Sequence, residues 1–177
     1  MLKPTVHCLF GQPAGPYFDT RFAVLRKPLG LPLGSERLAD DSDAYHAWVE
    51  LEENVVSVGR AHIIEAKSDG SGSDHAGPNA PLIPAFGPLK DGSAIRPAFQ
   101  IRQMGTLPIH QRKGFAALTL DALEQALIQH EGAKSGFLQA RVHAIPFYQS
   151  QGWNLIDEAY EIAGIGPHRS MTKSFND

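Results

Sequence analysis

The sequence predicts an α+β fold in which a mixed, mostly antiparallel sheet of six or seven strands is flanked by helices. Two observations predict this class. Two apolar runs joined by a short polar connection indicate a β-hairpin in the first half, and a strand, a turn, a helix and another strand follow one another in the second half. At 177 residues the chain fits a single domain, residues 1–177, that can bury a hydrophobic core.

The first half contains one helix and three strands. Residues 5–10 form a short apolar run typical of a strand. Residues 17–29 place apolar side chains at intervals of four, three and four, which predicts a helix that ends near Pro28. Residues 44–51 and 54–64 are the two strands of the hairpin.

Residues 67–97 are rich in Gly, Ser, Pro and Asp and contain few apolar runs. A loop of this length in a compact domain is usually functional or disordered. We interpret it as an insertion in the single domain, with residues 82–86 able to dock onto the body as an irregular flap.

The second half is more regular. Residues 99–107 alternate and stop at Pro108, as a strand does, and residues 114–131 carry the apolar stripe of an amphipathic helix. Residues 136–141 form the next strand. A strand–helix–strand crossover joins parallel strands, so we expect 99–107 and 136–141 to be nearly parallel. The remaining predicted elements are a short helix at 144–151 and strands at 153–156 and 169–173.

The turn 111–116 lies between the strand and the long helix. A helix that begins there leaves backbone N–H groups unpaired and places the positive end of its dipole behind them. Arg112 and Lys113 add positive charge. Such a turn favours the binding of a phosphate or pyrophosphate. The plainer interpretation is a strand-to-helix turn with solvated charges.

The motifs of the second half resemble the GNAT superfamily of N-acetyltransferases in order and spacing. Gln111-x-x-Gly114-x-Ala116 after a strand is similar to the acyl-CoA signature of that superfamily. The further matching motifs are Leu138-Gln139-Ala140-Arg141, Ala144-x-x-Phe147-Tyr148-x-x-x-Gly152-Trp153, Ala163-Gly164-Ile165 and His168-x-x-Met171-x-Lys173. Residues 21–30 also resemble the first helix of a bacterial subgroup with unassigned substrates.

The resemblance implies where acetyl-CoA binds. The pyrophosphate would lie on the turn, the pantetheine arm along the end of the preceding strand, and the sheet would splay between 99–107 and 137–141 to admit the cofactor. Gly105 inside a strand pattern is consistent with a bulge or a close-approach site. The implied cofactor-binding residues are Met104, Gly105, Thr106, Gln111, Arg112, Lys113, Gly114, Phe115, Ala116 and His143. His143 stands where related sequences often have Asn.

Tyr148 takes the position of the usual general acid of the superfamily, where a phenol protonates the departing thiolate of coenzyme A. The alternative is a helix tyrosine whose hydroxyl is satisfied locally. No motif identifies the general base that takes the proton of the amine. The candidates are His62, Glu65, Glu161, His168 and a water molecule.

The composition argues against several other classes of protein. The chain has 16 basic and 19 acidic residues and a net charge of −3, which is a poor footprint for a nucleic acid. No apolar run approaches the roughly 20 residues that span a bilayer. The eight histidines show no metal-ligand spacing and Cys8 is isolated, so we expect no metal. The single cysteine and the absence of a secretory signal predict a cytoplasmic protein.

We therefore expect acetyl transfer from acetyl-CoA to a primary amine, by direct attack in a ternary complex. The acceptor amine belongs to a small molecule or a protein, and the sequence leaves open its identity, the length of the acyl group and whether the chain forms a homodimer. The alternative is a non-catalytic acyl-CoA-binding sensor or interaction module, which keeps the turn without turnover.

Overall fold

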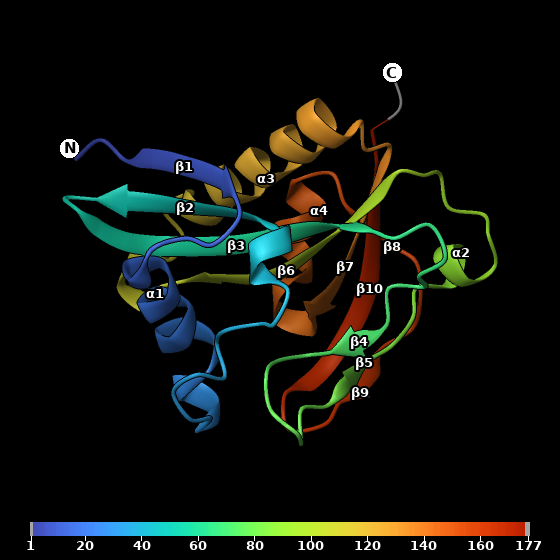
Figure 1. The fold of residues 1–177 in the computed structure, drawn as a ribbon, viewed down its shortest axis with the longest axis horizontal. Helices are drawn as coiled ribbons and strands as arrows, with labels where there is room; N and C mark the ends of the chain where they lie inside the picture. Colours follow the sequence, from blue (N-terminus) through green and yellow to red (C-terminus); the bar gives the residue numbers. More distant parts are fainter. Residues whose placement is uncertain (1, 176–177) are drawn as a thin grey trace.

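The computed structural model describes residues 2–175 and has a mixed sheet of eight strands with helices on both faces (Figure 1). The strand order is β1-β2-β3-β6-β7-β10-β8, and β9 pairs with β10. The strands of this sheet are β1 (Thr5–Phe10), β2 (Tyr45–Leu51), β3 (Asn54–Ile64), β6 (Ala98–Thr106), β7 (Ser135–Arg141), β8 (Asn154–Leu155), β9 (Tyr160–Ile162) and β10 (Gly166–Ser174). The predicted fold class is confirmed, and the sheet has one strand more than the upper end of the predicted range.

Both predicted supersecondary units are present. Strands β2 and β3 form an antiparallel hairpin, and its turn residues Glu52 and Glu53 both have positive φ, as a tight hairpin turn requires. Strands β6 and β7 are the one parallel pair among the strands of the described residues. The crossover between them runs through the long helix α3.

The helices are α1 (Gly15–Leu25), α2 (Gly87–Lys90), α3 (Phe115–Glu131) and α4 (Ile145–Ser150), with single 3-10 turns η1 (Lys27–Leu29), η2 (Asp41–Asp43), η3 (Pro108–His110) and η4 (Val142–Ala144). Helix α1 ends four residues earlier than predicted, because the ring of Pro28 cannot continue an α-helix and η1 follows instead.

The two larger helices cover opposite faces of the sheet. On β3, Val58 packs in a cluster with Tyr17 of α1, whereas Ala61 packs in the main core with Leu120 and Leu123 of α3. Residues an odd number of positions apart on a strand point to opposite faces. The main core therefore lies between the sheet and α3, and α1 closes the other side.

The insertion at residues 67–97 is docked against the sheet. It contains α2 and a two-stranded sheet of β4 (Gly72–Ser73) and β5 (Leu82–Ile83), which lies beside β9 and β10 in Figure 1. Phe86 and Leu89 are buried in a cluster with Ile64, Ala98 and Phe137. Phe86, the last residue of the segment 82–86, therefore packs onto the body of the domain. No helix within residues 2–175 has the length and apolar character needed to cross a membrane.

Candidate active site

The sheet splays between β6 and β7, as predicted. The parallel pairing covers only the first residues of each strand and ends at Gln100 and Phe137. Beyond that point Ile101 and Leu138 already line a cavity. Because two strands that separate leave space that no backbone hydrogen bond fills, the open end of this gap is where a ligand can enter the sheet.

Two cavities meet at this gap. The wide cavity, of about 810 Å³, runs from β6 past the turn before α3 to α4. The narrow cavity, of about 240 Å³, lies between α1, β6, β7 and β10. The residues that line both are Met104, Gly105, Thr106, Gln111, His143, Ala144 and Tyr148. A molecule in one cavity can therefore touch a molecule in the other at the position of Tyr148.

The turn before α3 has unpaired donors at the end of the wide cavity. Arg112 and Gly114 have φ of 60° and 85°, so the chain reverses sharply, and Gly114 is the N-cap of α3. Among residues 2–175 no acceptor binds the backbone N–H groups of residues 112–117. These donors, together with the helix dipole, form the anion-binding geometry expected from the sequence.

Nearly all the predicted cofactor-binding residues line the wide cavity: Met104, Gly105, Thr106, Gln111, Arg112, Gly114, Phe115, Ala116 and His143. Lys113 does not, and its Nζ donates to the Ile109 carbonyl at 3.0 Å. The ring of Phe115 is buried beside Val49 and Val56, so the part of Phe115 that can contact a ligand is its backbone.

The end of β6 is irregular, but the bulge lies before Gly105. The pairing with β3 shifts between Val58 and Arg60, and Gln103 has φ of 56°. A side chain at Gly105 would place its Cβ 2.5 Å from Val24 Cγ2. Helix α1 therefore approaches the backbone closely at Gly105. The distorted backbone of β6 lies before Gly105, at Gln103.

Tyr148 lies on α4 and lines both cavities. It is 8% exposed, and burial raises the pKa of its phenol well above the ordinary value of 10, an effect that the charge of Arg141 opposes. No hydrogen bond joins its hydroxyl to any residue of the range 2–175. The phenol is thus held protonated, and no residue of the described range satisfies its hydroxyl.

Of the four side chains that we considered as the general base, the structure brings only His168 into the narrow cavity. Its Nδ1 lies 2.8 Å from the Gly166 carbonyl, so Nδ1 carries the proton and Nε2 is left with a free lone pair. Burial lowers the pKa of His168, which keeps the ring neutral. His62 lines a different cavity near Asp40, and Glu161 lines a third beside β5. Glu65 is exposed and lines none of these cavities.

Four charged residues of the narrow cavity were not predicted as site residues: Arg26, Asp74, Arg102 and Arg141. Asp74 comes from the insertion, and its Oδ2 lies 3.0 Å from His75 Nδ1. Arg102 Nη2 donates to the carbonyls of Ser73 and Asp74 at 2.5 and 2.8 Å, which fixes the insertion beside the cavity. Arg141 stands in a motif that matches the superfamily, but no role was assigned to it, and Asp74 reaches the cavity only through the docking of the insertion.

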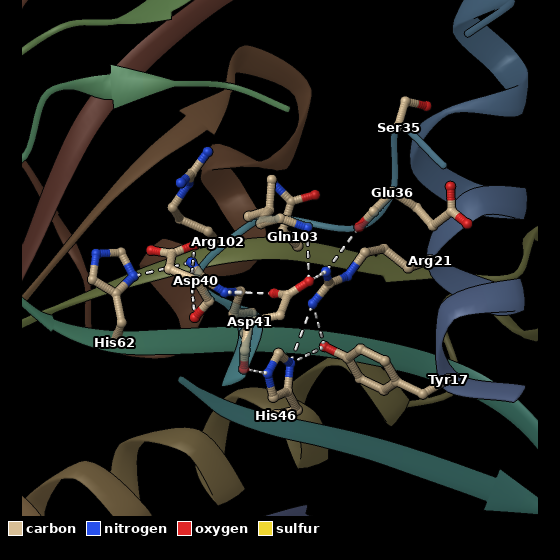
Figure 2. Close-up of polar contacts among 12 residues, drawn as sticks. Tyr17, Arg21, Ser35, Glu36, Asp40, Asp41, His46, His62, Arg102 and Gln103 are labelled. Carbon is tan, nitrogen blue, oxygen red and sulfur yellow. Dashed lines mark hydrogen bonds and ion pairs between the residues drawn. The ribbon is translucent and has the colours of Figure 1, made fainter. Parts of the chain in front are cut away.

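A buried ion network links side chains from the first half of the chain (Figure 2). Arg21 Nη1 lies 3.0 Å from Asp41 Oδ2, and Arg60 Nε lies 2.9 Å from Asp41 Oδ1. His46 Nε2 donates to the Asp41 carbonyl and its Nδ1 accepts from Arg21, so the ring is neutral. Burial lowers the pKa of His46 to about 4. The network joins α1, β2, β3 and the loop at Asp41.

Comparison with known proteins agrees with this geometry. Residues 89–175 match the family of acetyltransferase (GNAT) domains. An uncharacterised N-acetyltransferase of Bacillus subtilis, YjcF, is 33% identical over 87 residues, which are 48% of this chain and 56% of that protein. The chain thus spans about half the length of this curated relative.

Two solved structures share the fold over nearly the whole chain. Escherichia coli ElaA superposes with a TM-score of 0.64 at 16% identity, covering 98% of this chain and 100% of that one. A GNAT family acetyltransferase from Elizabethkingia anophelis, solved with acetyl-CoA bound, superposes with a TM-score of 0.55 at 11% identity, covering 97% and 98% of the two chains.

Proposed function

Because the chain belongs to the GNAT superfamily of acetyltransferases by residues 89–175 and by its fold, we propose that it transfers the acetyl group of acetyl-CoA to a primary amine. The transfer takes place by direct attack in a ternary complex, with acetyl-CoA as the acyl donor. The observation that carries the proposal is the meeting of two cavities at Tyr148, the wide one ending at the unpaired N–H groups of the turn.

Acetyl-CoA occupies the wide cavity. Its pyrophosphate lies on the backbone N–H groups of residues 112–117, with Arg112 adding a free cation. Its pantetheine arm follows the end of β6, where the bulge at Gln103 and the splay from β7 leave backbone groups available. The thioester then reaches the junction of the two cavities. A fold relative of this chain has acetyl-CoA bound, which supports the same class of donor.

The amine enters from the narrow cavity. Its nitrogen lone pair attacks the thioester carbonyl carbon, the new C–N bond forms, and collapse of the tetrahedral intermediate breaks the C–S bond. The proton of Tyr148 passes to the departing thiolate, and the proton lost by the amine passes to His168 or to a water molecule. Most of the rate comes from holding the amine and the thioester together.

The test is release of free thiol from acetyl-CoA in the presence of a panel of primary amines, with the signal of the exposed Cys8 thiol subtracted. We expect amine-dependent release. Tyr148→Phe removes only the hydroxyl, so it lowers kcat by about 10²-fold or more while the affinity for coenzyme A stays within about 3-fold.

A different outcome identifies the alternative. If acetyl-CoA binds tightly, no amine releases thiol and Tyr148→Phe changes nothing, the chain is an acyl-CoA-binding sensor and not an enzyme. If coenzyme A produces no thermal shift, the placement of the donor is wrong.

A further inference from the structure

Arg141 is an unpaired cation in the narrow cavity. It is the last residue of β7, it is partly buried, and it lines the cavity opposite α1. Among residues 2–175 its guanidinium has no hydrogen-bond or ion-pair partner. A guanidinium presents five N–H donors and stays charged in proteins, so one that is held in a cavity without a partner favours a bound anion.

The other charges of the cavity do not neutralise it. Three arginines and one carboxylate, Asp74, line the narrow cavity. Arg26 donates to the Ser35 carbonyl at 3.0 Å and to Gln103 Oε1 at 2.5 Å, and Arg102 donates to backbone carbonyls of the insertion. Those two are satisfied by neutral oxygens and keep their charge, so the cavity carries an excess of two positive charges.

The remaining wall mixes apolar side chains with neutral polar ones such as Gln103, Gln111 and Gln139, and the space is small. Leu25, Ile101, Leu138 and Ile165 are among the lining side chains, and the volume is about 240 Å³. This is below the roughly 300–1,000 Å³ of sites for drug-sized ligands. The occupant that fits this surrounding is small and carries one anionic group.

We propose that the acceptor is a small primary amine that carries a carboxylate, such as an amino acid, and that Arg141 determines this specificity by binding the carboxylate in a bidentate pair. This inference rests on the proposed acetyl transfer. Arg141 lies close enough to Tyr148 and His168 for its charge to act on both. A carboxylate on Arg141 therefore leaves the amine of a short acceptor within reach of the junction.

The same arrangement disfavours polycationic acceptors. A polyamine or an aminoglycoside would bring a second ammonium group against the three arginines of the wall. Like charges at close range in a partly buried site repel one another. We expect such compounds to be poor acceptors at any concentration that saturates the carboxylate amines.

The test compares amino acids with their own amides, which differ in the charge of one group. Glycine, alanine and leucine are paired with glycinamide, alaninamide and leucinamide in the thiol-release assay. The amide is the less basic amine, so chemistry alone favours it. We expect the wild-type chain to prefer the acid by about 10-fold or more in kcat/KM, because charge-assisted hydrogen bonds contribute roughly this much.

Arg141→Gln tests the residue. We expect the KM for each acid to rise about 10- to 100-fold, with kcat and the KM for each amide within about 3-fold, and Arg141→Lys to recover part of the loss. Arg37→Gln, an exposed arginine outside both cavities, is the control and leaves every value unchanged. A coenzyme A thermal shift equal to wild type checks that the variant is folded.

The outcomes separate this inference from the proposed function. If the amides are acetylated as well as the acids, or Arg141→Gln leaves the KM of the acids unchanged, the inference is wrong although the chain is an acetyltransferase. If no amine is acetylated, the anion site is tested by binding instead. The thermal shift of the chain is then measured in the presence of coenzyme A with each acid and with each amide. Stabilisation by the acids alone that Arg141→Gln abolishes supports the anion site, and no difference overturns it.

Discussion

Tyr148 and His168 reach the narrow cavity from α4 and β10, and burial moves their pKa values in opposite directions. The phenol is held protonated and the imidazole neutral. A pair of groups separated in this way is suited to act as acid and base at the same pH.

The pH dependence of kcat/KM tests these roles. After division by the fraction of unprotonated amine, kcat/KM is expected to be flat from about pH 6.5 to pH 10. A neutral base with a lowered pKa is free over that range, and a phenol with a raised pKa keeps its proton. His168→Gln is expected to lower kcat about 10²-fold with little change in KM.

Asp74→Asn is the matched variant, because Asp74 is the carboxylate of the same cavity. A loss in Asp74→Asn equal to the loss in His168→Gln would argue against His168 as the base. An acid limb that begins above pH 7 would also contradict the assignment.

The close packing of α1 against β6 requires a glycine at position 105. A Cβ there would lie 2.5 Å from Val24 Cγ2 and 3.2 Å from Val24 Cβ, and β-branched Val24 cannot turn away within α1. Gly105→Ala is therefore expected to lower the free energy of unfolding by roughly 1–3 kcal/mol. Urea denaturation measures this.

Gly15→Ala is the control for Gly105→Ala. Gly15 begins α1 with ordinary backbone geometry, and a Cβ there meets nothing within 4 Å. We expect Gly15→Ala to be neutral or slightly stabilising. Equal unfolding midpoints for the two variants would contradict the close approach of α1 to β6.

The local residue patterns predicted part of the site. The turn before α3, the end of β6 and Tyr148 were predicted from motifs, and the structure brings them to one cavity. Arg141 stands in a matching motif that was given no role in the cavity, and Asp74 carries no local signal of one. Asp74 reaches the cavity only because the insertion folds back and Arg102 binds its backbone, and that contact spans 28 residues of sequence.

At the scale of elements, we propose that the turn and α3 act as one anion-binding unit. Gly114 has φ of 85°, and nothing within 4 Å would touch a Cβ there. Gly114→Asp is expected to place a carboxylate among the free N–H groups, so the affinity for coenzyme A falls about 100-fold or more while the fold is kept. Calorimetric titration with coenzyme A measures this loss.

Gly114→Asn is the matched control, since Asn has nearly the shape of Asp, no charge, and a similar tolerance of positive φ. We expect it to bind coenzyme A clearly better than the Asp variant, and the gap to narrow at high salt. Equal weakening by both variants would mean that shape and not charge decides, and unchanged binding in both would move the pyrophosphate elsewhere.

The elements themselves were largely predictable where a strong periodicity or turn was present. The hairpin of β2 and β3 and the crossover through α3 follow from such patterns. Strand β9 was missed because its three residues are held only by pairing with β10, which a short run of sequence does not reveal. Helix α1 was predicted too long, because an apolar spacing alone does not report the 3-10 turn at Pro28.

At the scale of the whole molecule, the buried ion network holds the first half of the chain to the sheet. Arg21 and Arg60 are both 0% exposed and share Asp41, which is 1% exposed. No sequence pattern predicted this cluster, since its members lie on separate elements. Two histidines lie against its arginines: His46 beside Arg21 and His62, whose Nδ1 lies 3.2 Å from Arg60 Nη1.

These two histidines make stability depend on pH. Burial lowers the pKa of His46 to about 4 and of His62 to about 3, against an ordinary value of 6.5 in the unfolded chain. Above pH 6.5 both rings are neutral in both states. Below pH 6.5 the unfolded chain takes up protons that the folded chain does not. The free energy of unfolding therefore falls with decreasing pH, by up to about 1.4 kcal/mol per pH unit for each ring.

Urea unfolding between pH 8 and pH 5 tests this slope. His62→Gln keeps an acceptor for Arg60 but cannot bind a proton, so we expect the slope below pH 6.5 to fall by the contribution of this one ring, up to about 1.4 kcal/mol per pH unit, while the contributions of His46 and His168 remain and the slope above pH 6.5 is unchanged. His130→Gln, at an exposed position of α3, is the control and keeps the wild-type slope. A wild-type slope in His62→Gln would mean that His62 takes up its proton in the folded chain as it does in the unfolded chain. Burial and the charges of Arg60 and Arg102 would then lower the pKa of His62 less than the structure implies.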